Sequence, residues 1–196
     1  MENKKIKPHN FYALAEITLL EDTQDGIYVG QALSSKITQE YYYGKILDLG
    51  EKCTIESECP DLKKGDIAMF EQIAGYHAPT EDSYCKIVRG SNIVAKVKDM
   101  EKLNEPGNYI PTRNRILVEV LKEGLVNEDG IFDSTKEDPR DQATLKGRVI
   151  SCAEEADQYK PGTIVAFEPY CGNPIYNDGE LFLKTVHDFD ILFEIE

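Results

Sequence analysis

Apolar and β-branched residues fall in short runs along the chain, with the spacing of β-strands rather than of helices. Such runs occupy residues 11–20, 46–49, 67–70, 115–121 and 164–167. Turn-forming pairs such as Gly-Asp, Pro-Gly and Asp-Gly separate them at short intervals, and no segment keeps a helical period with caps at both ends. The pattern predicts an all-β chain built from small barrels or sandwiches.

Four blocks of this pattern occur twice, in the same order, and the second copy of each lies about 100 residues after the first. The pairs are residues 25–27 with 129–131, 44–47 with 147–150, 64–70 with 161–167, and 92–97 with 190–195. Ordered recurrence of four blocks predicts a duplicated domain. We place the first domain at residues 1–99, a linker rich in charged residues, Asn, Pro and Gly at 100–108, and the second domain at 109–196.

The order of the motifs in each copy resembles the GroES co-chaperonin family. An Ile close to a Pro precedes the first strand, a G-[KR]-[IV]-[LI] strand follows, and each copy closes on [ND]-I-[VL]. These motifs are Ile6-Lys7-Pro8 and Ile110-Pro111, Gly44-Lys45-Ile46-Leu47 and Gly147-Arg148-Val149-Ile150, and Asn92-Ile93-Val94 and Asp190-Ile191-Leu192. The resemblance implies two tandem GroES-like small β-barrels.

The family also pairs the last strand of one barrel with the first strand of its neighbour. Residues 93–97 are therefore expected to pair with the strand near Ile110 inside the chain. Repetition of that contact between chains would give a ring-like homo-oligomer.

The resemblance further implies a GroEL-type chaperonin as partner, contacted through a mobile loop at residues 21–43. The contact residues would be Gly26, Ile27, Tyr28, Val29 and Gly30. Acidic and polar flanks cannot sustain a packed core, and burying three apolar side chains contributes about 1.5–3 kcal/mol each. Ordering of the loop offsets much of that gain, so repetition around a ring would supply avidity. The other interpretation of these residues is a short edge strand.

The second copy departs from the family pattern at the equivalent residues, Gly130, Ile131 and Phe132. Asp133 stands where the third apolar residue is expected, and burying an unpaired carboxylate costs several kcal/mol, so weaker docking is predicted. The connections at residues 50–62 and 151–159 are short and acidic where family members often insert a roof hairpin. Both departures favour an alternative, a GroES-like barrel recruited as a structural or assembly protein, such as a viral capsid or scaffold component, that no longer binds chaperonin.

Composition narrows the classes of function. The net charge of −14 repels phosphate backbones and argues against nucleic-acid binding. No stretch approaches the roughly 18 apolar residues of a membrane span, and residues 1–5 lack the apolar core of a signal peptide. We expect no membrane association and a cytoplasmic location, in the host cytoplasm if a virus encodes the protein.

The candidate chemistry is sparse. Five widely spaced cysteines are expected to stay reduced and to hold no metal, and Cys53 and Cys59, in a polar loop, are interpreted as incidental. The three histidines are scattered, and neither a catalytic triad nor a phosphate-cradling glycine loop is present. No cofactor and no enzyme activity are predicted. The N-terminal portion of a medium-chain dehydrogenase, which has a GroES-like domain, is excluded because no dinucleotide-binding unit follows and no zinc ligands are evident.

Overall fold

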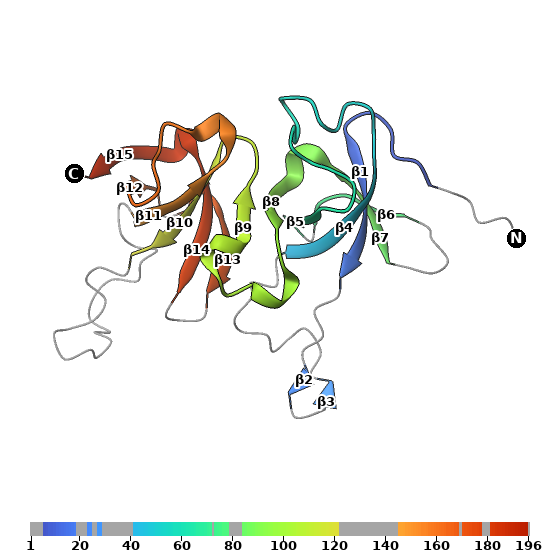
Figure 1. Cartoon of the computed structure of the whole chain (residues 1–196), viewed down its shortest axis with the longest axis horizontal. Helices are drawn as coiled ribbons and strands as arrows, with labels where there is room; N and C mark the ends of the chain where they lie inside the picture. Colours follow the sequence, from blue (N-terminus) through green and yellow to red (C-terminus); the bar gives the residue numbers. More distant parts are fainter. Residues whose placement is uncertain are drawn as a thin grey trace, which may run out of the picture.

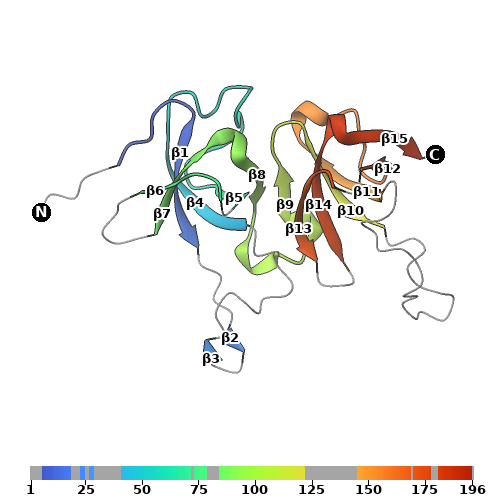
Figure 2. The ribbon, with the colours of Figure 1, turned by 180° about the vertical axis from the view of Figure 1, so that it is seen from behind.

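A computed structural model of the chain describes residues 6–18, 23–24, 27–28, 41–71, 73–78, 84–121, 145–168, 170–177 and 181–195. Most of the described strands form two large antiparallel sheets that lie side by side, and two short strands form a separate ribbon (Figures 1 and 2). In the described part of the chain the helices are all short 3₁₀ turns. The predicted all-β fold, with two barrel-like units, is confirmed.

The first sheet has the order β6-β7-β1-β4-β5-β8-β9. Its strands are β1 (Tyr12–Thr18), β4 (Tyr41–Leu49), β5 (Ile67–Glu71), β6 (Tyr76–Ala78), β7 (Cys85–Arg89), β8 (Ile93–Val97) and β9 (Tyr109–Pro111). The second sheet has the order β13-β14-β10-β11-β12-β15. Its strands are β10 (Arg115–Val120), β11 (Leu145–Cys152), β12 (Ile164–Phe167), β13 (Asn173–Asn177), β14 (Phe182–His187) and β15 (Ile191–Ile195).

The two sheets repeat one another in detail. Without β9, the strand order of the first sheet is that of the second. The ladder of β1 shifts register between Leu14 and Ala15, and the ladder of β10 shifts at the equivalent place, between Leu117 and Val118. Left-handed backbone also recurs in equivalent pairs: Asn10 with Arg113, Gly65 with Gly162, and Gly75 with Gly172. The two sheets thus share a strand order, the place of a register shift and three left-handed positions, while the domain bounds at residues 1–99 and 109–196 stay a prediction.

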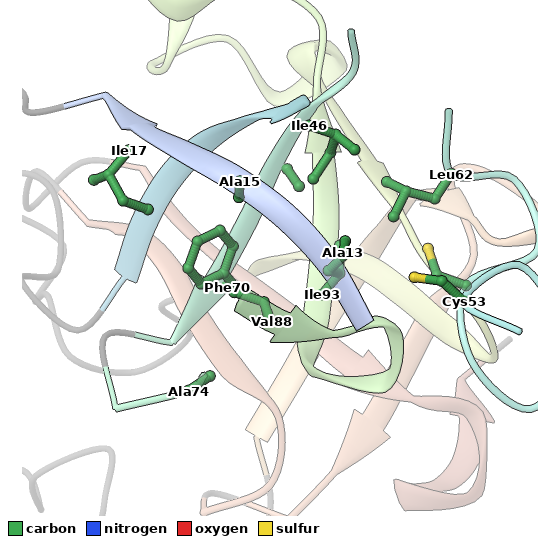
Figure 3. Close-up of a cluster of buried hydrophobic side chains, with 12 residues drawn as sticks. Ala13, Ala15, Ile17, Ile46, Cys53, Leu62, Phe70, Ala74, Val88 and Ile93 are labelled. Carbon is green, nitrogen blue, oxygen red and sulfur yellow. The ribbon is translucent and has the colours of Figure 1, made fainter. Parts of the chain in front are cut away.

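Each sheet curls around its own core because alternate side chains of a strand point to one face. In the first sheet Ala13, Ala15 and Ile17 of β1 point inward toward Phe70 (Figure 3). A Cβ on Gly44 would lie 3.2 Å from Cε1 of Phe70, so glycine lets the ring pack against the strand. The second core is built from residues at equivalent positions, namely Ile116, Val118, Val120, Val149, Val165, Phe167 and Val186.

The connection between β4 and β5 closes one end of the first core. Cys53, Cys59 and Leu62 are buried in that core, so the interpretation of both cysteines as incidental is wrong. The polar residues around them hid their burial, since a loop that folds back over a core needs only a few apolar anchors. Glu58, 1% exposed, accepts hydrogen bonds from Arg89 and Ser91.

A third cluster of buried side chains joins the two barrels. Tyr43, Met69, Ala95, Val97 and Tyr109 of the first sheet pack against residues of the second, namely Leu117, Ile175, Tyr176 and Leu183. The segment predicted as a linker is part of this packing: it forms 3₁₀ turns at Met100–Lys102 and Pro106–Asn108, and Leu103 is buried. Within the described residues, no helix is long and apolar enough to cross a membrane.

Candidate functional site

The segment predicted to contact a chaperonin begins where β1 and β4 end side by side. Ile17 pairs with Gly44, and Thr18 pairs with Tyr43, so both arms of the connection at residues 19–40 leave from neighbouring points on the barrel. The second barrel repeats this geometry, because Val120 of β10 pairs with Gly147 of β11. Each copy therefore carries a long connection between the same two strands.

Part of the first connection forms a small ribbon of its own. β2 (Thr23–Gln24) pairs with β3 (Ile27–Tyr28), with Gln24 opposite Ile27 and Thr23 opposite Tyr28. The ribbon shares no described strand with either large sheet and lies apart from both, beyond the end of β1 (Figures 1 and 2). Ile27 and Tyr28 are thus in a strand, but not in a strand at the edge of a barrel.

The other predicted contact residues cannot be placed in this way. Gly26, Val29 and Gly30 lie outside the described residues, and so do Gly130, Ile131 and Phe132 of the second copy. Their role stays a prediction.

The junction between the barrels is a second candidate site, and its central strand pairing is the one expected from the sequence. β8 pairs antiparallel with β9, with Lys96 opposite Ile110 and Val97 opposite Tyr109. The prediction that residues 93–97 pair with the strand near Ile110 is confirmed. β9 lies in the segment predicted as the second domain, and in the structure it completes the first sheet.

Three polar side chains that follow β9 form hydrogen bonds across this junction. Thr112 Oγ1 and Arg115 Nη1 donate to the carbonyl oxygen of Ile93, at 2.7 and 3.2 Å, and Arg113 Nη1 donates to the carbonyl oxygen of Ser91 at 3.3 Å. Thr112 and Arg115 are buried. Sequence reasoning missed these residues, because nothing in a lone Arg shows that it will reach a neighbouring domain.

β15 is the edge strand of the second sheet and lies far from the junction between the barrels (Figures 1 and 2). Several of its side chains are exposed to solvent, whereas the equivalent side chains of β8 are buried. Leu192 is 49% exposed and Phe193 53%, whereas Val94 and Ala95 at the equivalent positions are buried. The apolar character of β15 was visible in the sequence, but its exposure was not.

The buried cysteines Cys53 and Cys59 and the buried Lys86 contribute to the packing of the first barrel. Burial raises the pKa of Cys53 to about 11 and that of Cys59 to about 12, so both thiols are protonated at neutral pH and poor nucleophiles. Burial lowers the pKa of Lys86, whose Nζ donates to the carbonyl oxygen of Ala74 at 2.9 Å. Among the described residues, no three His, Cys, Asp or Glu side chains are grouped so that they could hold a metal ion.

Comparison with known proteins decides the family. No protein-family profile matches the chain. The chain is 35% identical over 78 residues to the co-chaperonin GroES of Sulfurovum sp. (strain NBC37-1), and the match covers 39% of this chain and 85% of that protein. The chain belongs to the GroES family. The family assignment accounts for the all-β fold and confirms the resemblance inferred from the sequence motifs.

Proposed function

We propose that this GroES-family chain is a co-chaperonin that carries two tandem GroES-like domains, at residues 1–99 and 109–196, and that it caps a GroEL-type chaperonin and assists protein folding without catalysis. The relative is called a co-chaperonin, and 85% of it corresponds to 78 residues, roughly the length of one repeat. The shared strand order of the two sheets supports a second GroES-like copy.

The observation that carries the proposal is the separate ribbon of β2 and β3. A chaperonin contact must reach beyond the barrel, and Ile27 and Tyr28 lie in a ribbon that shares no described strand with the barrels. Both arms of the connection that contains the ribbon start from the paired ends of β1 and β4. The predicted docking residues are Gly26, Ile27, Tyr28, Val29 and Gly30.

The junction between β8 and β9 supports self-association as part of the same function. It shows how one barrel of this protein binds the next, through strand pairing and an apolar cluster. A ring made by repeating such junctions would present several copies of the docking segment to one chaperonin ring, and several weak contacts together give a stable but releasable complex.

Co-sedimentation with a GroEL-type chaperonin in the presence of nucleotide tests this function. The intact chain should form a complex, and Ile27→Ser should weaken it at least about tenfold, since an apolar side chain of this size contributes about 1.5–3 kcal/mol when buried. Ile55→Ser is the matched control, because it makes the same substitution at a residue that is 41% exposed and lies in the connection between β4 and β5. Absence of a complex with the intact chain would overturn the proposal.

The second candidate is a GroES-like barrel that serves as a structural or assembly protein and no longer binds chaperonin. Asp133 favours it, and so do the two short connections that replace a roof hairpin. Both connections fold back on their own barrels, as the burial of Cys53 and Ala156 shows. A chain that self-associates but forms no complex with chaperonin would support this candidate.

A further inference from the structure

Two of the five cysteines, Cys53 and Cys59, lie in the connection between β4 and β5 that closes the first barrel. We propose that their thiols form a reversible disulfide, with a small-molecule disulfide as the oxidant, and that this bond locks the connection onto the barrel. The pair would then be a site of covalent modification that makes one end of the fold sensitive to redox conditions. The inference is independent of the proposed binding of a chaperonin.

The backbone brings the two cysteines within reach of one another. The N–H of Cys59 donates to the carbonyl oxygen of Cys53, with 3.1 Å between N and O. Standard bond lengths from each Cα to these atoms then limit the separation of the two Cα atoms to about 7 Å. Cysteines can be bridged up to about this separation, so the fold already meets the first requirement for the bond.

Both side chains point into the same core. Cys53 is 0% and Cys59 1% exposed, and both belong to the cluster that contains Leu62 and Ala13. Figure 3 shows the side chains of Cys53 and Leu62 directed from the connection toward the strands of the barrel. A disulfide carries no charge and suits this apolar surrounding. A metal ion held by the pair would need two thiolates, which burial disfavours because it raises both pKa values.

The two repeats show how the pair arose at one place in the fold. Equivalent glycines are 103 residues apart before the connection, at Gly44 and Gly147, and 97 residues apart after it, at Gly65 and Gly162. The connection of the first barrel is therefore six residues longer than that of the second.

The added residues lie between the two cysteines. Counted from the glycines before the connection, Cys53 is equivalent to Ala156, and counted from the glycines after it, Cys59 is equivalent to the same alanine. The hydrogen bonds agree: the N–H of Ala156 donates three residues back, as that of Cys53 does, and its carbonyl oxygen accepts from three residues on, as that of Cys59 does. Two cysteines thus stand at the place that one buried alanine occupies in the second barrel.

The chain between the cysteines is held tightly against the barrel. A Cβ on Gly90 would lie 3.2 Å from Sγ of Cys53 and 3.1 Å from Cβ of Glu58. The carboxylate of Glu58 accepts hydrogen bonds from Arg89 and from the backbone N–H of Ser91. The disulfide would close a loop that contains Glu58, and it would therefore restrain this carboxylate where it fastens the connection.

The bond forms by thiol–disulfide exchange with a small disulfide, R–S–S–R. The thiolate of one cysteine attacks a sulfur of the oxidant, the S–S bond of the oxidant breaks, and RS⁻ leaves. The thiolate of the other cysteine attacks the protein sulfur of this mixed disulfide, and a second RS⁻ leaves as the Cys53–Cys59 bond forms. The two thiol protons end on the released thiolates, so the cysteines lose two electrons and the oxidant becomes two molecules of RSH.

Exchange requires the connection to open, because both cysteines are buried. Residues 51–58 form turns and bends and add no strand to the sheet, so they can move away without breaking a strand ladder. Glu58 opposes this opening through its hydrogen bonds to Arg89 and Ser91. The thiols therefore react during brief openings, and the disulfide returns to the core when the connection closes.

Peptide mapping by mass spectrometry tests the site. The full chain is incubated with excess oxidised glutathione at about pH 8, where thiolates are more abundant, and the remaining thiols are alkylated after unfolding. Most chains should contain a link between Cys53 and Cys59, with the loss of two hydrogens, and dithiothreitol should remove it. Cys85, which belongs to a different cluster, should be alkylated.

Two alanine variants serve as controls for the link. Cys53→Ala should abolish it, and this variant should fold, since alanine stands at the equivalent place in the second barrel; circular dichroism checks the fold. Cys152→Ala should leave the link unchanged, because Cys152 lies in the second barrel.

Thermal unfolding tests the locking. The oxidised chain should have a Tm about 5 °C above that of the reduced chain, because closing this short loop restricts the unfolded chain. The same oxidant should leave the Tm of Cys53→Ala unchanged.

The rate of oxidation tests the opening. Glu58→Gln should form the link several-fold faster than the wild type, because the connection is less firmly held. Glu119→Gln, which changes an ion pair on the second barrel, should keep the wild-type rate.

Three results would each overturn the proposal. They are a wild type that keeps both thiols, a chain in which Cys53 or Cys59 binds glutathione without forming the link, and a linked chain with the Tm of the reduced one. None of these measurements involves a chaperonin, so each leaves the proposed function as it stands.

Discussion

Glu58 is a charged side chain that is almost fully buried, in the connection that closes the first barrel. Its Oε1 accepts hydrogen bonds from Nε and Nη2 of Arg89, at 2.9 and 2.7 Å, and its Oε2 accepts one from the backbone N–H of Ser91 at 2.8 Å. Burial acts to raise the pKa of Glu58, but these hydrogen bonds outweigh it and hold the pKa below its ordinary value of 4.5. The ionised carboxylate is therefore the form that the fold stabilises.

Replacing this carboxylate should destabilise the protein. We expect Glu58→Gln to lower the free energy of unfolding by about 2 kcal/mol at pH 7, because hydrogen bonds to a charged group are lost. A lowered folded-state pKa adds stability that is present above pH 4.5 and lost as the pH falls through the folded pKa. Urea unfolding at pH 7 and pH 4 measures both effects: the variant should lack the part of the acid sensitivity that Glu58 contributes.

The matched control is an ion pair on the surface. Arg148 Nη1 lies 3.1 Å from Oε2 of Glu119, and the two side chains are 51% and 34% exposed, against 1% for Glu58. Glu119→Gln should change the free energy of unfolding by less than about 1 kcal/mol. Equal losses in the two variants would contradict the role assigned to burial of Glu58.

At the scale of the elements, the glycine of each G-[KR]-[IV]-[LI] strand sets how closely the strand approaches an aromatic ring. A Cβ on Gly147 would lie 2.9 Å from Cε1 of Phe167 and 3.0 Å from Cβ of Val118. Gly147→Ala should therefore overpack the second core and cost about 1–3 kcal/mol in urea unfolding. Gly107→Ala, where nothing lies within 4 Å of an added Cβ, should stay within about 0.5 kcal/mol of the wild type.

The strands were the most predictable part of this molecule, because their apolar runs and turn residues are local signals. The predicted strand at residues 164–167 is β12 as observed, and the predicted strand at 11–20 contains β1. The packing of the connections was not predictable. Leu103 and Cys53 sit in polar segments, and only the folded chain shows that they meet a core.

At the scale of the whole molecule, the cluster between the barrels contains buried tyrosines. Burial raises the pKa of Tyr43 from 10 to about 12, and burial together with the neighbouring Tyr43 raises that of Tyr109. A raised folded-state pKa means that this contribution to stability is complete below pH 10 and is lost as the pH rises toward the folded value. The junction should therefore weaken in alkali.

Tyr43→Phe isolates this effect. At pH 7 the free energy of unfolding should change by no more than about 1 kcal/mol, while up to about 3 kcal/mol of the loss between pH 10 and pH 12 should disappear. Chemical unfolding across this pH range measures it, with Tyr76→Phe as the control outside the junction. An unchanged alkaline loss in Tyr43→Phe would show that Tyr43 does not govern the pH dependence.

The candidate sites, like the fold, have some features that could be predicted from the sequence and others that could not. The pairing of residues 93–97 with the strand near Ile110 was implied by the family resemblance, and the structure contains it. The polar fastening by Arg113 and Arg115 did not follow, because it depends on which backbone carbonyl groups the folded neighbour presents. The docking segment at residues 26–30 was proposed from the resemblance, and its chaperonin contact stays a prediction.

The pairing of β9 with β8, which precedes it by only a short segment, has a consequence for synthesis of the chain. When residue 97 has emerged from the ribosome, β8 is complete but its outer edge has no partner, and an unpaired strand edge is a template for wrong pairing. Its partner β9 begins about a dozen residues later, which at about 5–20 residues per second corresponds to roughly one second of translation. A translational pause within residues 98–108 would prolong the time during which the edge of β8 is unpaired. A pause just beyond Pro111 would come after β9 has become available to pair with β8.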